Sequence, residues 1–197
     1  MYTRRISEQF LFTKEKGSLF NVKVWMKLLV KKSTPCYGNE NRNRNLKVRL
    51  MKIIEVKENK KQYLDLLLLA DEQEDMVDRY LDSGKMYVLD DNGVKCECVI
   101  TDKENDILEI KNIATVPEYQ GKGYARALIE FIVNNYREQY AILQVGTGDS
   151  PLTIPFYEKC GFVRSHIISN FFIDNYDHPI YESGVQLVDM VYLQRPL

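Results

Sequence analysis

The sequence lacks any long apolar run and is poor in proline and glycine. With 45% hydrophobic residues, 6 prolines and 10 glycines in 197 residues, it differs from disordered and fibrous chains and can bury one hydrophobic core. No segment approaches the ~20 apolar residues of a membrane-spanning helix, and no signal peptide is visible. We therefore expect a soluble, cytoplasmic protein with no membrane partner.

Cysteine and histidine are scarce. The four cysteines are Cys36, Cys96, Cys98 and Cys160. No two of them form the Cys-x-x-Cys pair typical of zinc and redox sites, although Cys96 and Cys98 would share one face of a strand. The two histidines, His166 and His178, are too far apart in sequence to indicate a metal site. We expect reduced thiols, ordinary histidines and no metal.

Charge is unevenly distributed along the chain. Residues 1–50 hold 12 Lys and Arg against 3 acidic residues, whereas residues 51–197 hold 15 against 25. The asparagine- and arginine-rich stretch 39–45 shows no apolar periodicity and is typical of a linker. Residues 1–50 are therefore interpreted as a basic, poorly ordered extension or as a basic arm for an anionic partner, and residues 51–197 as the folded domain.

The segment 108–136 carries the clearest functional pattern. Residues 108–116 resemble a strand, Pro117 follows, and the turn Gln120-Gly121-Lys122-Gly123-Tyr124-Ala125 opens a helix. The first backbone N–H groups of a helix lack internal partners and lie at its positive end, so an anion can bind there. Glycine allows close approach of the backbone. The turn is predicted to cradle a diphosphate.

The helix that follows is amphipathic. Its buried face is predicted to hold Ala125, Leu128, Ile129, Ile132, Val133 and Tyr136. Spacing excludes two other nucleotide-binding motifs. A P-loop needs Gly-x-x-x-x-Gly-Lys before Ser or Thr, and a dinucleotide fingerprint needs a glycine where Arg126 stands.

The pattern Gln120-x-x-Gly123-x-Ala125 resembles the acyl-CoA signature of the GNAT N-acetyltransferases, in which Arg or Gln, two residues, Gly, one residue and then Gly or Ala follow one another. Pro117 stands at that family's usual place. Downstream, the segment 156–162, Phe-Tyr-Glu-Lys-Cys-Gly-Phe, is similar to the family's Tyr-x-x-x-Gly-Phe motif. The resemblance covers about residues 52–194.

The resemblance implies an α/β fold of GNAT type, with a mixed, mostly antiparallel sheet flanked by helices on both faces. Strands are expected near 52–56, 85–90, 94–101, 108–116, 140–145, 162–173 and 185–194. Helices are expected near 60–69, 72–82, 125–136 and 153–159. The segments 91–93 and 102–106 are predicted turns.

The resemblance also implies where acetyl-CoA binds, as co-substrate. Backbone groups at the end of the signature strand would pair with the pantetheine arm, and the turn would hold the diphosphate. The implied cofactor-binding residues are Ala114, Thr115, Val116, Gln120, Gly121, Lys122, Gly123, Tyr124, Ala125 and Arg126. The side chains of Lys122 and Arg126 could equally be solvated surface charges, because the backbone does most of the anion binding.

Tyr157 matches the family's tyrosine that protonates the CoA sulfur, and a phenol with an ordinary pKa near 10 carries its proton at pH 7. The alternative is that Tyr157 only packs against pantetheine. Pro155 falls where the short helix should form, so that helix is expected to begin at Thr153.

Glu109 is the candidate general base or anchor for the substrate ammonium group, with surface charge as the alternative. Regular alternation would place Glu109, Lys111 and Ile113 on one face of the strand, and Leu108, Ile110 and Asn112 on the other.

Two further segments bear on the substrates. Many GNAT proteins carry an asparagine after the strand near 140–145. Here Asp149 is present, which would cap the next helix or face the substrate amine. The segment 171–182 mixes aromatic and acidic residues and resembles the substrate wall of a bacterial GNAT subgroup, which would suit a cationic amine.

Together these patterns predict an acetyl-CoA-dependent N-acetyltransferase that transfers directly to a primary amine of a small molecule or peptide. Two alternatives remain: a non-catalytic CoA-sensing module with a nucleic-acid-docking arm, and an acetyltransferase of aminoacyl-tRNA that needs that arm. The resemblance also points to a homodimer formed through the C-terminal strands. The acceptor is not encoded in any motif.

Overall fold

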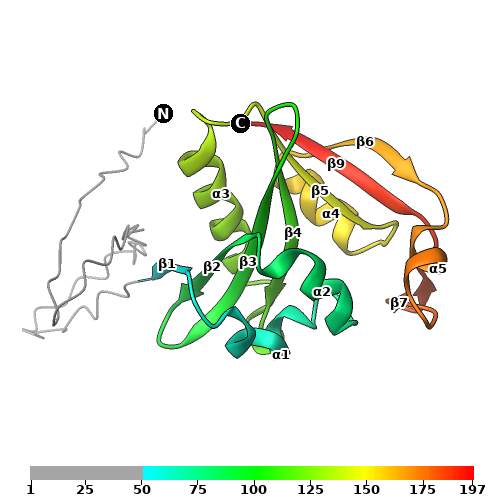
Figure 1. Ribbon diagram of the computed structural model, residues 1–197, viewed down its shortest axis with the longest axis horizontal. Coiled ribbons are helices and arrows are strands. Elements are labelled where there is room, and N and C mark those ends of the chain that lie inside the picture. The colour runs from blue at the N-terminus through cyan, green and yellow to red at the C-terminus, as the bar shows by residue number, and fades with distance from the viewer. Residues whose placement is uncertain (1–50) are drawn as a thin grey trace, which may run out of the picture.

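The computed structural model describes residues 51–197, and the basic segment 1–50, with Cys36, lies outside them. These residues form a seven-stranded sheet in the order β1-β2-β3-β4-β5-β9-β6 (Figure 1). The strands are β1 Lys52–Val56, β2 Lys85–Asp90, β3 Val94–Lys103, β4 Ile107–Thr115, β5 Ile142–Gly148, β6 Val163–Ile168 and β9 Met190–Pro196. β4 and β5 are parallel, and the other neighbouring pairs are antiparallel.

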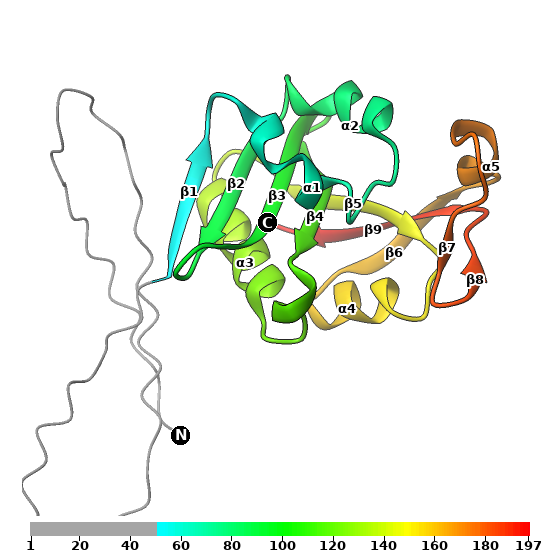
Figure 2. The same ribbon diagram turned by 90° about the horizontal axis from the view of Figure 1, so that it is seen from below.

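Helices cover both faces of this sheet (Figure 2). α3 (Tyr124–Tyr136) and α4 (Thr153–Lys159) pack on one face, over a core that includes Leu128, Cys96 and Cys98. α1 (Leu64–Leu67) and α2 (Glu74–Leu81) pack on the other, over a core that includes Val99. The predicted fold class is confirmed.

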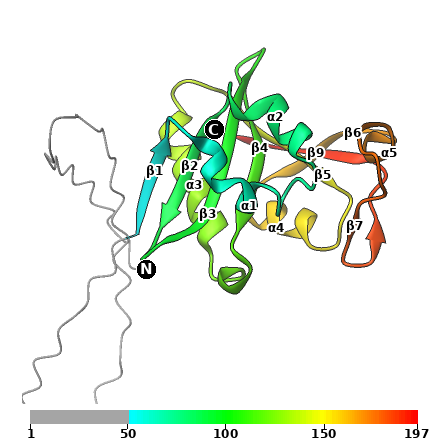
Figure 3. The same cartoon turned by 60° about the horizontal axis from the view of Figure 1, so that its bottom comes forward.

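The remaining elements are short. η1 (Lys60–Tyr63) precedes α1, and η2 (Pro117–Tyr119) precedes the glycine-rich turn. After β6 come α5 (Phe171–Asn175) and the hairpin β7 (Tyr181–Glu182) and β8 (Val185–Gln186). Figure 3 shows α5 and β7 at the β6 and β9 side of the sheet, away from β1. Within residues 51–197 no helix is long and apolar enough to cross a membrane.

β4 and β5 pair over only part of their length. The ladder runs from Ile107 opposite Ile142 to Ile110 opposite Val145, yet β4 continues to Thr115 and β5 to Gly148. The two strands diverge beyond that point (Figure 2). The backbone edges that face each other there are not joined by the sheet's own hydrogen bonds.

A β-bulge at Lys111 accompanies this divergence. Ile110 lies opposite Ile100 and Asn112 opposite Val99, so Lys111 is the extra residue on β4. The predicted alternation is therefore wrong after Ile110. Ile113 packs in the core under α3 together with Ile110, while Asn112 faces α1 and α2. One inserted residue shifts the side-chain pattern by one position.

The element boundaries differ from prediction mainly after β6. The strand expected over 162–173 ends at Ile168, because Asn170 adopts a left-handed conformation (φ 59°) and α5 follows. The strand expected over 185–194 is divided into β8 and β9. The turn at 91–93 is confirmed, with positive φ at both Asn92 and Gly93 as a type I′ hairpin requires.

α4 begins at Thr153, as the position of Pro155 predicted. Pro155 is then in the first turn, where its missing N–H costs no helical hydrogen bond. Asp149 does not cap this helix: the N-cap position is Leu152, and Asp149 instead forms an ion pair of 3.2 Å with Arg164. The proposed capping role was wrong.

Candidate active site

The start of α3 presents unpaired backbone donors. The first main-chain bond of the helix is Ala127 N–H to the Gly123 carbonyl (3.0 Å), so the N–H groups of Ala125 and Arg126 precede the helical ladder. No side chain caps the helix start. These donors, at the positive end of a 13-residue helix, form an anion site.

Gly121 and Gly123 shape the turn in front of these donors. Their φ angles are +68° and +86°, which a residue with a Cβ adopts only at a cost. A Cβ built on either glycine would meet no heavy atom within 4 Å. The space beside the turn is open, as the approach of a phosphate requires.

The side chains predicted for this site divide into two groups. Lys122 and Arg126 are exposed, and Lys122 donates to the Glu118 carbonyl (2.6 Å). Tyr124 is buried, and its hydroxyl donates to Asp91 (2.7 Å), so only its backbone can reach a ligand. That bond ties the start of α3 to the turn between β2 and β3.

The end of β4 offers part of the backbone edge expected for pantetheine. Ala114 and Thr115 lie where β4 has left β5. The Thr115 carbonyl accepts a bond from the Gln120 side chain (3.3 Å), which links the strand end to the turn. The N–H of Val116 donates to the Lys95 carbonyl (2.9 Å) and its carbonyl accepts from the N–H of Tyr119 (2.8 Å), so both backbone groups of Val116 already have a partner.

Tyr157 lies on α4 and is buried, with its ring edge-on to Phe156 and Phe162. Burial raises the pKa of Tyr157 well above its ordinary value of 10, with smaller contributions from Cys98, Cys160 and Glu182. The phenol is therefore protonated throughout the physiological range. Within the described residues its hydroxyl has no hydrogen-bond partner that would compete for the proton.

Glu109 lies on the opposite face of the sheet and is also buried (1% exposed). Its carboxylate is within 2.7 Å of Lys103 Nζ and 3.2 Å of Lys111 Nζ, and the Tyr192 hydroxyl donates to it at 3.4 Å. The interpretation as a surface charge is excluded by this burial. Two lysine ammonium groups therefore lie against this buried carboxyl group.

Asp71, between α1 and α2, gathers hydrogen bonds from distant parts of the chain. The hydroxyls of Tyr80 (3.3 Å) and Tyr176 (3.0 Å) donate to its two oxygens. Burial raises the pKa of Asp71 above its ordinary value, and these two bonds oppose the shift. Tyr176 belongs to the predicted aromatic and acidic wall, so that segment reaches across to α1 and α2.

A second contact joins the same segments. The exposed His178 lies between Asp177 and Glu72, at 3.4 Å from the latter. These two carboxylates raise the pKa of His178 above its ordinary value. Asp71, Tyr80 and Glu72 escaped the sequence analysis because no motif marks them. The partners of Asp71 and Glu72 in the predicted wall, Tyr176 and His178, are also about a hundred residues away.

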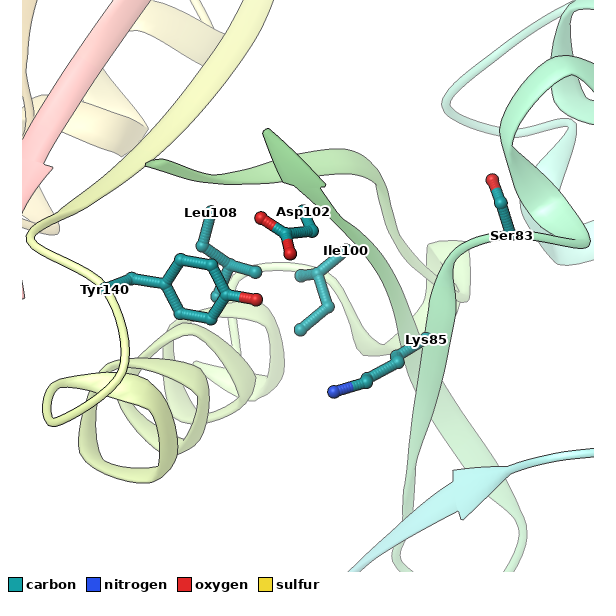
Figure 4. Close-up of a pocket in the computed structure, with 6 residues that line it drawn as sticks. All are labelled: Ser83, Lys85, Ile100, Asp102, Leu108 and Tyr140. Carbon is teal, nitrogen blue, oxygen red and sulfur yellow. The ribbon is translucent and has the colours of Figure 1, made fainter. Parts of the chain in front are cut away.

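A small pocket of about 110 Å³ lies elsewhere, at the beginning of β4 (Figure 4). It is lined by Ser83, Lys85, Ile100, Asp102, Leu108 and Tyr140. Because the glycine-rich turn follows the end of β4, this pocket is at the other end of the strand and is not part of the site.

Comparison with known proteins agrees with this arrangement. The family profile described as acetyltransferase (GNAT) domain matches residues 82–164. The uncharacterized N-acetyltransferase YvbK of Bacillus subtilis (strain 168) is 36% identical over 132 residues, which cover 66% of this chain and 85% of that protein.

Solved structures give the same result. A GNAT acetyltransferase from Elizabethkingia anophelis with acetyl-CoA bound is 33% identical with a TM-score of 0.71, covering 75% of this chain and 98% of its own. An IAA acetyltransferase from Bacillus cereus is 32% identical with a TM-score of 0.70, covering 75% and 99%.

The chain belongs to the GNAT acetyltransferase family. It is an N-acetyltransferase, as the sequence motifs predicted.

Proposed function

We propose that this protein transfers the acetyl group of acetyl-CoA directly to a primary amine of a small molecule or peptide, without an acyl-enzyme. The observation that carries the proposal is the divergence of β4 and β5 immediately beside the uncapped start of α3. An extended pantetheine arm can bind between the diverging strands as an added strand would. A diphosphate can bind at the N-terminus of α3. The solved relative with acetyl-CoA supports this choice of co-substrate.

Each residue of the site has a distinct proposed part. The backbone of Gly121 to Arg126 holds the diphosphate, and a backbone N–H of β4 polarises the thioester carbonyl. Tyr157 gives its proton to the departing sulfur. Glu109, which also contacts Lys103 and Lys111, orients the ammonium group of the acceptor.

Release of thiol from acetyl-CoA with a panel of primary amines tests the proposal. Turnover stimulated by an amine supports it. CoA binding without turnover on any amine would favour the non-catalytic CoA-sensing alternative. The residues that would bind and react all lie within 51–197, so the same assay on a chain lacking 1–50 decides whether the basic arm is needed.

The acceptor is proposed to be cationic, and Asp71→Asn tests this. Asp71 accepts hydrogen bonds from Tyr80 and Tyr176, and we propose that the acceptor binds beside these groups. A carboxylate and aromatic rings together favour an ammonium group. Removing the charge is expected to raise KM for a cationic amine about tenfold with little change in kcat, because a charge-assisted hydrogen bond contributes about 1.5–3 kcal/mol.

The matched control is Asp65→Asn, which removes an exposed carboxylate from α1. Steady-state kinetics with a monovalent and a polyvalent amine measure the effect. An unchanged KM for both amines in Asp71→Asn would contradict the cationic assignment.

We also propose a homodimer that functions in the reducing cytoplasm. Cys96, Cys98 and Cys160 are free and buried, as in a reduced protein. β6 is an edge strand of the sheet and exposes Val163 (65%) and Ile167 (57%), a liability that pairing with a second copy would cover. Light scattering is expected to give twice the chain mass, and Ile167→Lys to give a monomer. A monomeric wild type would contradict the dimer.

A further inference from the structure

Glu97 is a carboxyl group buried within the sheet. It lies in the middle of β3, opposite Val88 on β2 and Ala114 on β4, and is 0% exposed. Neither of its carboxyl oxygens has a hydrogen-bond partner among residues 51–197. Cys96 and Cys98 face α3, so strand alternation places Glu97 on the face covered by α1 and α2, together with Val99.

Such a group is costly to the fold. A buried polar group without a hydrogen bond destabilises the folded state, and an unpaired buried charge destabilises it more. An apolar side chain at position 97 would match Val99 and remove the cost. Unsatisfied groups of this kind concentrate at functional sites, which directs attention to what surrounds Glu97.

Glu97 lies next to the place where β4 leaves β5. Neighbouring strands are about 4.8 Å apart, and the residue opposite Glu97 on β4 is Ala114, whose side chain is a single methyl group. Ala114 belongs to the stretch that no longer pairs with β5. The proposed reaction occurs where β4 and β5 diverge, which we call the slot. Glu97 is on β3, so the Ala114 side chain and the width of β4 lie between its carboxyl group and the slot.

Asn112 is the diagonal neighbour of Glu97 on the same face and has a second unpartnered atom. Its side-chain nitrogen donates to the Leu67 carbonyl (3.0 Å) and to the Tyr80 hydroxyl (2.8 Å), which fixes its orientation. Its Oδ1 is buried and, within residues 51–197, accepts no bond. Three acceptor oxygens therefore lie close to the slot without a donor, a set that a water or an amine could satisfy.

We propose that Glu97 accepts, through one water held by Asn112, the proton that the attacking amine loses. This inference rests on the proposed acetyl transfer. The ammonium form of the acceptor first loses one proton to solvent. The neutral amine nitrogen then forms a bond to the thioester carbon, and the carbon–sulfur bond breaks. One proton passes from nitrogen through the water to Glu97, and the sulfur leaves with the proton of Tyr157. Proton exchange with solvent then returns both residues to their starting states.

The surroundings suit a proton acceptor near neutral pH. Burial raises the pKa of Glu97 to about 8, and the backbone amide of Ala114 opposes the shift without forming a full hydrogen bond. A base is most effective when its pKa is near the working pH.

Other titratable groups interact with Glu97 but remain protonated over this range. They are Tyr80 from α2 and the thiols of Cys96 and Cys98 on β3 itself, and burial raises the pKa of each, that of Cys96 to about 12. On the same face of the sheet, Asp71 accepts a hydrogen bond from Tyr80, and Lys111 lies over the Tyr80 ring. Lys111 also forms an ion pair with Glu109.

The test is Glu97→Gln in the full chain, with acetyl-CoA and an amine that stimulates the wild type. Because the ionised carboxylate is required, ionisation of Glu97 should contribute a rise of about tenfold per pH unit to wild-type kcat/KM up to pH 8 and no further rise above it. The ratio of wild type to variant, which cancels the ionisation of the amine, should grow from about 10 at pH 7 to about 100 at pH 9. CoA affinity should not change.

Glu104→Gln, in the exposed turn between β3 and β4, is the matched control and should keep the wild-type profile. A ratio near 1 at every pH overturns the role of Glu97. If the wild type releases no thiol with any amine, the proposed function fails on its own.

Even in that case, the pH dependence of thermal unfolding tests whether Glu97 titrates. A raised folded-state pKa makes the wild type lose stability as pH rises from 4.5 through 8, whereas Glu97→Gln should not. A constant difference in Tm between the two proteins from pH 5 to pH 9 would overturn the inference, because Glu97 would not titrate.

Discussion

Replacing Tyr157 by phenylalanine is expected to slow acetyl transfer about a thousandfold, within the range of general acid catalysis. The thiolate of CoA leaves poorly without a proton, and Tyr157 is the buried phenol that retains one. Phenylalanine keeps the edge-on ring contacts with Phe156 and Phe162, so the fold and Tm should be preserved. Single-turnover thiol release measures the chemical step directly.

The matched control for this variant is Tyr181→Phe, which removes a hydroxyl from an exposed tyrosine of β7. It should retain the wild-type rate. CoA affinity, measured by calorimetry, should be the same for Tyr157→Phe and wild type. A rate loss of less than threefold would show that Tyr157 only packs against the co-substrate, which was the alternative role.

Gly123→Val is expected to weaken CoA binding about a thousandfold, or roughly 4 kcal/mol. Two effects combine. Gly123 has φ +86°, so a β-branched residue strains the turn, and its side chain would occupy the open space through which the diphosphate approaches the first N–H groups of α3. Several charge-assisted bonds of about 1.5–3 kcal/mol each would be lost together.

Gly184→Val is the control that separates backbone strain from steric blocking of the diphosphate. Gly184 is in the turn between β7 and β8, with φ +79° and the same open surroundings. It should lose stability comparably but keep CoA affinity. Pantetheine, which has no diphosphate, should bind Gly123→Val and wild type alike in calorimetry. Equal CoA affinity of Gly123→Val and wild type would exclude the turn as the anion site.

The strand, turn and helix of the proposed CoA site were predictable because their information is local. A strand, a turn with two glycines and a helix with one apolar face are contiguous in sequence, and α3 begins one residue after Gly123 as the turn requires. The position of α4 followed from Pro155 in the same way, since proline restricts where a helix can begin.

The acceptor half was less predictable because its contacts are not local. Asp71 and Tyr176 are 105 residues apart, and only tertiary packing brings them together. The bulge at Lys111 was missed for another reason. The consecutive polar residues Lys111 and Asn112 interrupt the apolar–polar alternation, but only pairing with Ile100 and Val99 shows that β4 has one residue too many.

The segment after β6 has its own small core of Phe172, Ile180 and Leu187. Its buried side chains are distinct from those of the cores beneath α3 and α2, although Tyr176 bonds to Asp71 and Leu187 lies against Gly148 of β5. Substitutions of its exposed side chains, such as Tyr181, are therefore expected to leave the packing of α3 unchanged. Variation among homologous chains is expected to be tolerated more readily on this outer surface than beneath α3.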